Sequence, residues 1–391
     1  MVNFTILAGG FSTFIATYVF NSDASTLTLT EQTTTGPNPS WIALHPENSS
    51  ILYAVNEIGP IGSLQSFLVN ADGGLTLVDT VSSGGNGPTF TNPLSTGEVT
   101  AMNFGSPNCS LVATVPGDPL HFQRDSPVVN FPVNGGPSNP HMSLEFNGEV
   151  FIADFGADKI WRLKNTGTPG NFIVQGQIDV APGNGPRHLA VHDNILFVVN
   201  ELTSTLTAQQ IPEAPNGTTQ PLLANVSTIP QDDLGLNASF RVAELIISEP
   251  TEQFPTPLIY VSNRNLGPDF DPRGDTVAIY EFKNCTGADP VSDAPISRRA
   301  HARSWSRRQE TVGSGNAYPS AFVLQSQTFT GLTQIRSMAL GHVEDGGDQF
   351  LIAGANTEGG VAVFSRVDGG RNLTLVARNE DVQNRTSFVF L

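Results

Sequence analysis

The stretch Leu196–Glu201, with the sequence LFVVNE, decides the fold because close copies of it recur along the chain. Leu52–Glu57 (LYAVNE) and Leu258–Arg264 (LIYVSNR) repeat the same pattern. Each copy is an apolar, β-branched or aromatic run typical of a strand, and each stops at Asn followed by a charged residue. Recurrence of one unit predicts a repeat fold, and a charge at the same point of several units predicts one shared site.

Length and composition narrow the fold class and the kinds of partner. A chain of 391 residues exceeds a single-core domain and fits several domains or a repeat array. Short apolar runs between Gly, Pro, Asn and Ser clusters predict an all-β protein. No run of 18 apolar residues is present, so no membrane partner is expected. The net charge of −17 argues against nucleic-acid binding, which needs a positive surface.

The repeated unit is expected to contain four antiparallel strands. First strands are expected at Pro39–His45, Val99–Phe104, Pro140–Leu144, Pro186–Val191, Arg241–Leu245 and Ile335–Leu340. Second strands are expected at Ile51–Val55, Leu111–Val115, Val150–Ala153, Ile195–Val199, Leu258–Ser262 and Phe350–Ala353. Four antiparallel strands in units of about 40–60 residues are typical of β-propeller blades.

The two ends of the chain predict how the ring closes. Phe4–Gly36 supplies the later strands of a seventh unit but lacks a first strand, and Ser387–Leu391 is a lone apolar strand. If the C-terminal strand fills the missing place, no sheet edge stays free. The predicted fold is therefore an all-β, seven-bladed β-propeller, with six or eight blades as alternatives. Residues 1–391 are expected to form one domain, with a loop insertion at about 287–318.

Glycosylation sequons indicate the compartment. The pattern Asn-X-Ser/Thr begins at nine positions: Asn3, Asn48, Asn108, Asn216, Asn225, Asn237, Asn284, Asn372 and Asn384. This number is roughly twice that expected by chance and predicts an extracellular glycoprotein that carries N-glycans. Met1 leads directly into strand residues, so a secretion signal is expected to have been removed.

The two cysteines, Cys109 and Cys285, do not form a disulfide framework. They are expected in distant blades, which favours unpaired thiols over a disulfide. Neither has a neighbouring His or cation that would lower the pKa of the thiol, which argues against a catalytic Cys.

Charged residues at strand ends form the candidate site. The start of a first strand and the end of the second meet at one end of a blade, because the strands are antiparallel neighbours. Arg side chains there could bind a carboxylate or stabilise an oxyanion, and His or Glu could move a proton. The set favours an anionic or polarised carbonyl substrate. Its members are His141, Arg187, His188, Glu201, Arg264 and Arg336, with Asn56, Glu57, Asn200 and Asn263 as further substrate contacts.

No cofactor is expected, because no group of carboxylates or His residues has metal-ligand spacing. The group that comes closest to such spacing is Asp269, Asp271 and Asp275, which leaves a bound Ca²⁺ as the alternative.

The segments Gly185–His188 (GPRH) and Val198–Glu201 (VVNE) resemble the lactonase family of seven-bladed propellers. That family includes bacterial propeller-type 6-phosphogluconolactonases and fungal carboxy-cis,cis-muconate lactonizing enzymes. Pro140-His141, Val261–Arg264 and the segment around Arg336 follow in the expected order, so the resemblance covers nearly the whole chain. The resemblance implies that the active site is formed by His141, Arg187, Glu201 and Arg264.

The expected function is that of a secreted lactonase that hydrolyses the cyclic ester of a small, sugar-acid type lactone. His141 or Glu201 would be the general base, and Arg187 and Arg264 would orient the substrate and stabilise the oxyanion. One alternative is an intramolecular lyase or cycloisomerase of the carboxymuconate type, acting on a carboxylated substrate. Another is a non-catalytic extracellular binding propeller.

Overall fold

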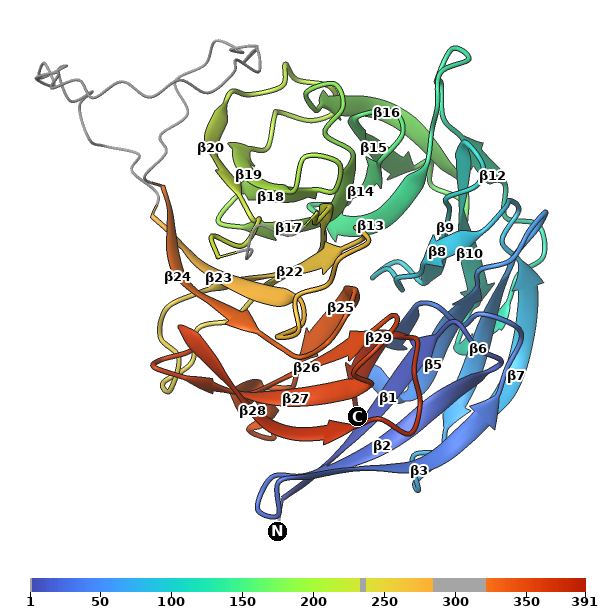
Figure 1. Ribbon diagram of the computed structural model, residues 1–391. Coiled ribbons are helices and arrows are strands. Elements are labelled where there is room, and N and C mark those ends of the chain that lie inside the picture. The colour runs from blue at the N-terminus through green and yellow to red at the C-terminus, as the bar shows by residue number, and fades with distance from the viewer. Residues whose placement is uncertain (1, 233–236, 284–320) are drawn as a thin grey trace, which may run out of the picture.

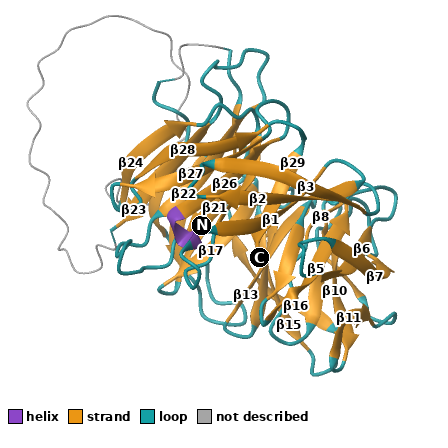
Figure 2. Cartoon of the chain, turned by 90° about the horizontal axis from the view of Figure 1, so that it is seen from below, coloured by secondary structure: helices purple, strands orange, loops and turns teal. Residues whose placement is uncertain are grey.

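Seven antiparallel sheets surround a common centre, as Figure 1 shows. The computed structural model describes residues 2–232, 237–283 and 321–391. Within these ranges the chain is almost entirely strand and loop, apart from one short 3₁₀ turn, η1 at Gly347–Gln349 (Figure 2). None of the described residues belongs to a helix long and apolar enough to cross a membrane. The predicted all-β, seven-bladed propeller is confirmed.

We number the blades along the chain and give their strands from the innermost outwards. Blade 1 contains β29 (Arg385–Phe390), β1 (Asn3–Gly10), β2 (Phe14–Asn21) and β3 (Thr26–Thr34). Blade 2 contains β4 (Ile42–His45), β5 (Asn48–Asn56), β6 (Ser63–Val69) and β7 (Leu75–Ser82). Blade 3 contains β8 (Pro88–Phe90), β9 (Glu98–Asn103), β10 (Asn108–Val115) and β11 (Asp118–Phe122), with β12 (Val128–Asn130) also paired to β10.

The four remaining blades have the regular four-stranded pattern. Blade 4 contains β13 (Pro140–Phe146), β14 (Glu149–Asp154), β15 (Lys159–Asn165) and β16 (Phe172–Asp179). Blade 5 contains β17 (Pro186–His192), β18 (Ile195–Asn200), β19 (Thr205–Gln210) and β20 (Leu222–Ser227). Blade 6 contains β21 (Phe240–Ile247), β22 (Ile259–Asn265), β23 (Thr276–Phe282) and β24 (Phe322–Phe329). Blade 7 contains β25 (Ile335–Leu340), β26 (Phe350–Ala355), β27 (Val361–Val367) and β28 (Asn372–Asn379).

The C-terminal strand closes the ring as predicted. β29 pairs with β1 in antiparallel register and becomes the innermost strand of blade 1, where Figure 1 shows it beside the N-terminal strands. The Oγ of Ser387 also accepts a hydrogen bond of 3.0 Å from the backbone N–H of Ile42 in blade 2. This strand therefore joins the last part of the chain to both of the first two blades.

Blade 3 differs from the sequence prediction. Val99–Phe104 is not a first strand, because β8 lies inside it and β9 is the second strand. β8 has only three residues, too few to be recognised as a strand in the sequence. The insertion predicted at about 287–318 lies outside the described residues; β23 and β24, which precede and follow it, are the third and fourth strands of blade 6.

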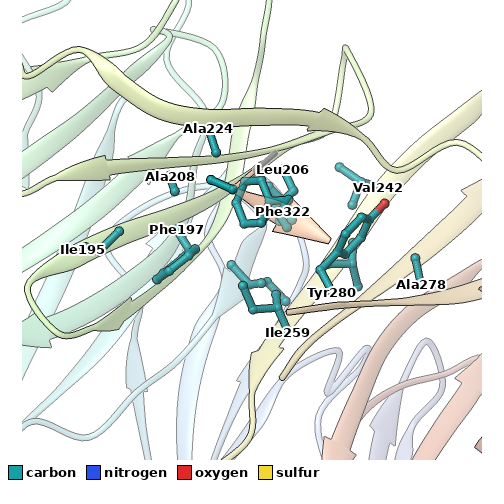
Figure 3. Packing of buried hydrophobic residues seen from close by; sticks show 14 residues of the cluster. Ile195, Phe197, Leu206, Ala208, Ala224, Val242, Ile259, Ala278, Tyr280 and Phe322 are labelled. Carbon is teal, nitrogen blue, oxygen red and sulfur yellow. The ribbon is translucent and has the colours of Figure 1, made fainter. Parts of the chain in front are cut away.

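The core lies between neighbouring blades. Ile195, Phe197 and Val199 pack toward blade 6, in the cluster that Figure 3 shows with Tyr280 and Phe322. The alternating residues of the same strand, Leu196 and Val198, pack toward blade 4. The second strand of the blade is thus buried on both faces, which explains why the repeated segment is continuously apolar.

Replacing Phe388→Ala should cost about 3–5 kcal/mol of unfolding free energy, because it leaves a cavity in a core that blades 1 and 7 share. Urea unfolding of the variant measures this loss. Phe270→Ala is the control, since Phe270 is 48% exposed and its loss should change stability by less than about 0.5 kcal/mol. Equal, small losses in the two variants would contradict the closure described above.

Candidate active site

A β-bulge recurs at the beginning of the first strand in several blades. The register shifts by one residue between Pro88 and Phe90, Pro140 and Met142, Pro186 and His188, and Ile335 and Ser337. A bulge leaves one residue without an opposite partner and re-aims its side chain. The residues left without an opposite partner at these bulges are Thr89, His141, Arg187 and Arg336.

The residue that follows the second strand lies beside this bulge. In all seven blades its backbone N–H donates a hydrogen bond of 2.8–3.1 Å to a carbonyl that precedes the first strand of the same blade. The donors are Phe11, Glu57, Phe104, Phe155, Glu201, Leu266 and Asn356. The same backbone position therefore presents a carboxylate in blades 2 and 5 and an aromatic ring in blades 1, 3 and 4.

The recurrent Asn, predicted as a substrate contact at Asn56, Asn200 and Asn263, makes hydrogen bonds within the propeller. All three are at most 1% exposed. Asn263 Nδ2 donates to the carbonyl of Thr228 at the end of blade 5, with an N···O distance of 2.6 Å. Asn200 bonds to Thr205 and Thr207 of its own blade, and Asn56 accepts from Ser63. These side chains fasten the second strand to adjacent strands.

Glu201 lies between two arginines from adjacent blades. Its Oε2 is 2.9 Å from Arg187 Nε and 2.8 Å from Arg264 Nη2. Both contacts are ion pairs that give Arg187 Nε and Arg264 Nη2 a charged partner. Burial alone would raise the pKa of Glu201, but the charges of Arg264, Arg187 and Arg336 outweigh it and hold the pKa below its ordinary value. Glu201 is therefore ionised at neutral pH.

Arg187 is anchored more firmly than Arg264. It is 1% exposed, and its Nη1 donates to the carbonyl of Ala243 at 2.7 Å. Burial, followed by the charge of Arg264, lowers the pKa of Arg187 to about 9, which leaves the guanidinium charged at neutral pH.

Arg336 and Glu57 meet from blades 7 and 2. Arg336 Nη2 lies 3.4 Å from Glu57 Oε2, and the guanidinium lies over the ring of Phe11 at 5.0 Å from its centroid. Phe11 belongs to blade 1, so this contact spans the blade at which the ring closes. Glu57 thus lies next to Arg336, as a shared site requires.

Two buried histidines complete the cluster. The rings of His141 and His188 have centroids 5.1 Å apart. Burial, and then the charge of Arg187, hold the pKa of His141 well below its ordinary value, so this ring is neutral. His188 Nδ1 is 2.5 Å from Glu244 Oε1.

Aromatic side chains surround the histidines. Trp41 and Phe90, from blades 2 and 3, contact the ring of His188 with centroid distances of 5.2 and 5.9 Å. Phe104 contacts His141 at 5.7 Å. The site therefore has a charged part from blades 2, 5, 6 and 7 and an aromatic part from blades 1, 2, 3 and 4.

Glu244 and the aromatic residues were missed at the sequence level. Glu244 lies in the predicted first strand Arg241–Leu245, but only the fold brings it to His188. Phe104 could have been found, because it follows Asn103 as Glu201 follows Asn200.

The aspartates considered for Ca²⁺ are used otherwise. Asp271 pairs with Arg273 at 2.8 Å, and Asp275 accepts the backbone N–H groups of Asn265 and Gln334. Burial raises the pKa of Asp275 to about 6. Among the described residues, no group of three or more His, Cys, Asp or Glu is placed to hold a metal. Cys109 is a free, buried thiol, and Cys285 lies outside the described residues.

The charged cluster is identified by its chemistry rather than by cavity volume. Hollows of about 290 and 280 Å³ lie at the other end of the inner strands. Ile247 lines both, Leu340 lines the first and His192 lines the second. Neither hollow contains a residue of the Arg, Glu and His cluster.

Glu201→Gln should lower the unfolding free energy by about 3 kcal/mol, because it leaves the buried Arg187 without a counter-charge. Glu57→Gln is the matched control and should cost less than about 1 kcal/mol, since its pair with Arg336 is longer and more exposed. Urea unfolding of both variants makes the comparison. A larger loss for Glu57→Gln would show that Glu201 is not the main counter-ion.

Comparison with known proteins agrees with this architecture. Residues 5–293 match the family described as lactonase, 7-bladed beta-propeller. A probable 6-phosphogluconolactonase of Arthroderma benhamiae is 27% identical over 290 residues, which cover 70% of this chain and 69% of that protein. A 6-phosphogluconolactonase of Formosa agariphila is 27% identical over 295 residues, 71% of this chain and 77% of the relative.

Solved structures share the fold. A putative 6-phosphogluconolactonase from Bacteroides fragilis superimposes with a TM-score of 0.75 at 16% identity, covering 100% of this chain and 98% of the other. The periplasmic gluconolactonase PpgL of Pseudomonas aeruginosa gives a TM-score of 0.74 at 15% identity, covering 100% and 99%. Together with the family match, which extends over most of the sequence, these likenesses show that the chain belongs to the lactonase family of seven-bladed β-propellers.

Proposed function

We propose that this protein hydrolyses the ester bond of a small lactone at the Arg, Glu and His cluster. The observation that carries the proposal is a pair of buried arginine N–H groups without an acceptor, Arg264 Nε and Arg336 Nε, beside the ion pairs of Glu201 with Arg187 and Arg264. Buried donors without a partner are costly and call for a ligand. A carbonyl oxygen that becomes an oxyanion is the acceptor that such preorganised donors stabilise best.

His141 suits the role of general base better than Glu201 does. Glu201 is held ionised by Arg187 and Arg264, and its lowered pKa makes it a weak proton acceptor. His141 is neutral at pH 7 and can accept a proton. Of the two candidate bases left open by the sequence, we assign the role to His141, because Glu201 Oε2 is already paired with Arg187 and Arg264.

The reaction then proceeds through one tetrahedral intermediate. His141 removes a proton from water as the water oxygen bonds to the lactone carbonyl carbon. The carbonyl electron pair moves onto its oxygen, beside Arg187 and Arg264. The pair then returns, the bond to the ring oxygen breaks, and that oxygen takes the proton from His141 to give an open hydroxy acid.

The substrate class follows from the relatives. Two of them are named 6-phosphogluconolactonase, which supports a sugar-acid lactone as the first class to test. A sugar ring could also place its C–H face on Phe104 while its polar groups meet the arginines. The carboxymuconate cycloisomerase and the non-catalytic binding propeller are the alternative functions.

We also propose that the protein is secreted and carries N-glycans, for which the exposure of its sequons is the support. Six of the eight sequon Asn residues that the structure describes are exposed: Asn3, Asn48, Asn216, Asn225, Asn237 and Asn384. Asn108 and Asn372 are half-buried, and Asn284 lies outside the described residues. Peptide mass spectrometry of protein from its native host tests this, and unoccupied sequons throughout would contradict it.

A screen of aldono-lactones, aromatic lactones and acyl-homoserine lactones, read by proton release, should find a hydrolysed substrate. Arg264→Ala and Arg187→Lys should each lower kcat/KM by about 10²–10³, because each removes oxyanion donors. Arg378→Ala is the control. Among the described residues, the hydrogen-bond partners of Arg378 are the backbone carbonyls of Thr330 and Gly331. Full activity of both site variants on that substrate would contradict the assignment.

An ultraviolet assay with carboxymuconate separates the hydrolase from the cycloisomerase. The hydrolase should leave carboxymuconate unchanged while it turns over a lactone. Turnover of carboxymuconate by a protein inert to every lactone in the screen would replace the proposed reaction with the alternative.

The pH profile of kcat/KM should be flat from pH 8 down through pH 6.5 and fall only at lower pH. The reason is that His141 must be neutral to act, and its pKa lies well below the ordinary 6.5. An activity already half lost at pH 6.5 or above would contradict His141 as the base.

A further inference from the structure

Two histidine nitrogens inside the site are buried without a hydrogen-bond partner. They are His141 Nδ1 and His188 Nε2, on rings whose planes are tilted by 53° and whose centroids are 5.1 Å apart. Both side chains are at most 4% exposed. A buried polar atom left unpaired is costly, so two of them on contacting rings call for a functional reason.

Glu244 determines where the proton of His188 lies. Its Oε1 is 2.5 Å from His188 Nδ1, and a carboxylate can only accept from that nitrogen. Burial outweighs the attraction of Glu244 and keeps the pKa of His188 below its ordinary value, so the ring is neutral. A neutral ring that donates from Nδ1 has its lone pair on Nε2, the nitrogen that faces no other partner.

Glu244 itself is held in place from both sides. Its Oε1 accepts the backbone N–H of Leu245 at 3.0 Å, and its own backbone N–H donates to Ser262 Oγ at 3.0 Å. Ser262 Oγ in turn donates to the carbonyl of Ile335, beside the bulge that releases Arg336. The carboxylate is thus fixed by the inner strands of blades 6 and 7.

We propose that Glu244 and His188 are positioning residues that orient His141 for catalysis. Glu244 fixes His188 with its proton on Nδ1, and His188 Nε2 accepts the Nδ1–H of His141. This arrangement leaves the lone pair of His141 on Nε2, where it can take the proton of the attacking water. We call this chain of Glu244, His188 and His141 the relay, and it rests on the proposed lactone hydrolysis. The two rings are in contact and the two nitrogens lack partners, so the proposed link would form by ring rotation or through a bridging water when substrate binds.

The charges around His141 explain why a relay is needed. The strongest charges that act on its ring are those of Arg187, Arg336 and Arg264, and all three are positive. An imidazolium formed during proton transfer would therefore be destabilised. Glu244 supplies a negative charge on the far side of His188, as a buried carboxylate does behind a catalytic His.

The relay balances without a further reactant. The proton that leaves water goes to His141 Nε2, while the Nδ1–H of His141 stays bonded and points to His188. When the ring C–O bond breaks, the same proton passes from Nε2 to the leaving oxygen. Glu244 and His188 end each cycle in their starting protonation states.

Glu244→Gln and His188→Gln should lower kcat by about 100-fold or more and change KM by less than about threefold, because neither residue contacts substrate. Glu244→Gln should also move the acid limb of the pH profile to lower pH, since a lost negative charge lowers the pKa of His141 further. A role in folding alone would not shift this limb.

Glu149→Gln is the matched control. Glu149 is a carboxylate of similar burial that pairs with buried Arg162 in the outer part of blade 4, away from the cluster. Its loss should lower the melting temperature and leave kcat and the pH profile unchanged. The relay is overturned if Glu244→Gln keeps wild-type kcat. It is also overturned if Glu244→Gln and Glu149→Gln both lose kcat in parallel with stability.

Nitrogen-15 NMR of the histidine side chains gives a readout that does not depend on activity. His188 should carry its proton on Nδ1 in the wild type and lose this preference in Glu244→Gln. A proton on His188 Nε2 in the wild type would overturn the relay even if lactones are hydrolysed. Conversely, the Nδ1 proton together with inactivity on every lactone would overturn the proposed function and leave the geometry of the relay supported.

Discussion

The pairing of β29 with β1 is the contact on which the rest of the molecule depends. It joins the last strand of the chain to the first and makes the last strand the innermost one of blade 1. Only a closed ring brings blade 7 against blade 1. The ion pair of Arg336 with Glu57, which passes over Phe11, exists because of that closure.

The site is built from a backbone irregularity rather than from special loops. A bulge at the start of the first strand turns His141, Arg187 and Arg336 out of the regular strand pattern, and the end of each second strand adds Glu201 and its equivalents. The same backbone can therefore present charges in some blades and aromatic rings in others. Chemistry is concentrated in blades 4 to 7 because only their bulges carry ionisable residues, together with Glu244 in the longer bulge of blade 6.

Much of this arrangement could be predicted from the sequence, since strands buried on both faces leave a continuous apolar signal that ends in a fixed motif. LFVVNE and its copies predicted the blades, the lone C-terminal strand predicted the closure, and Arg187, Glu201 and Arg264 meet as expected. β8 was missed because three residues carry no periodicity. The hydrogen bonds of Asn200 within its blade could not be predicted, because its partners Thr205 and Thr207 are identified only by the strand register. Glu244 was missed for the same reason, since its partner His188 is in another blade.

The central claim is that water attacks a lactone carbonyl beside Arg187 and Arg264, with His141 as the base. Hydrolysis in ¹⁸O-labelled water tests it most directly, because the position of the label records which bond the water forms. The account predicts one ¹⁸O atom in the carboxylate of the hydroxy-acid product and none in its hydroxyl group. A product labelled in the hydroxyl would indicate attack at the alkyl carbon, and an unsaturated acid formed without any label would indicate a lyase-type elimination. Either result would contradict attack at the carbonyl.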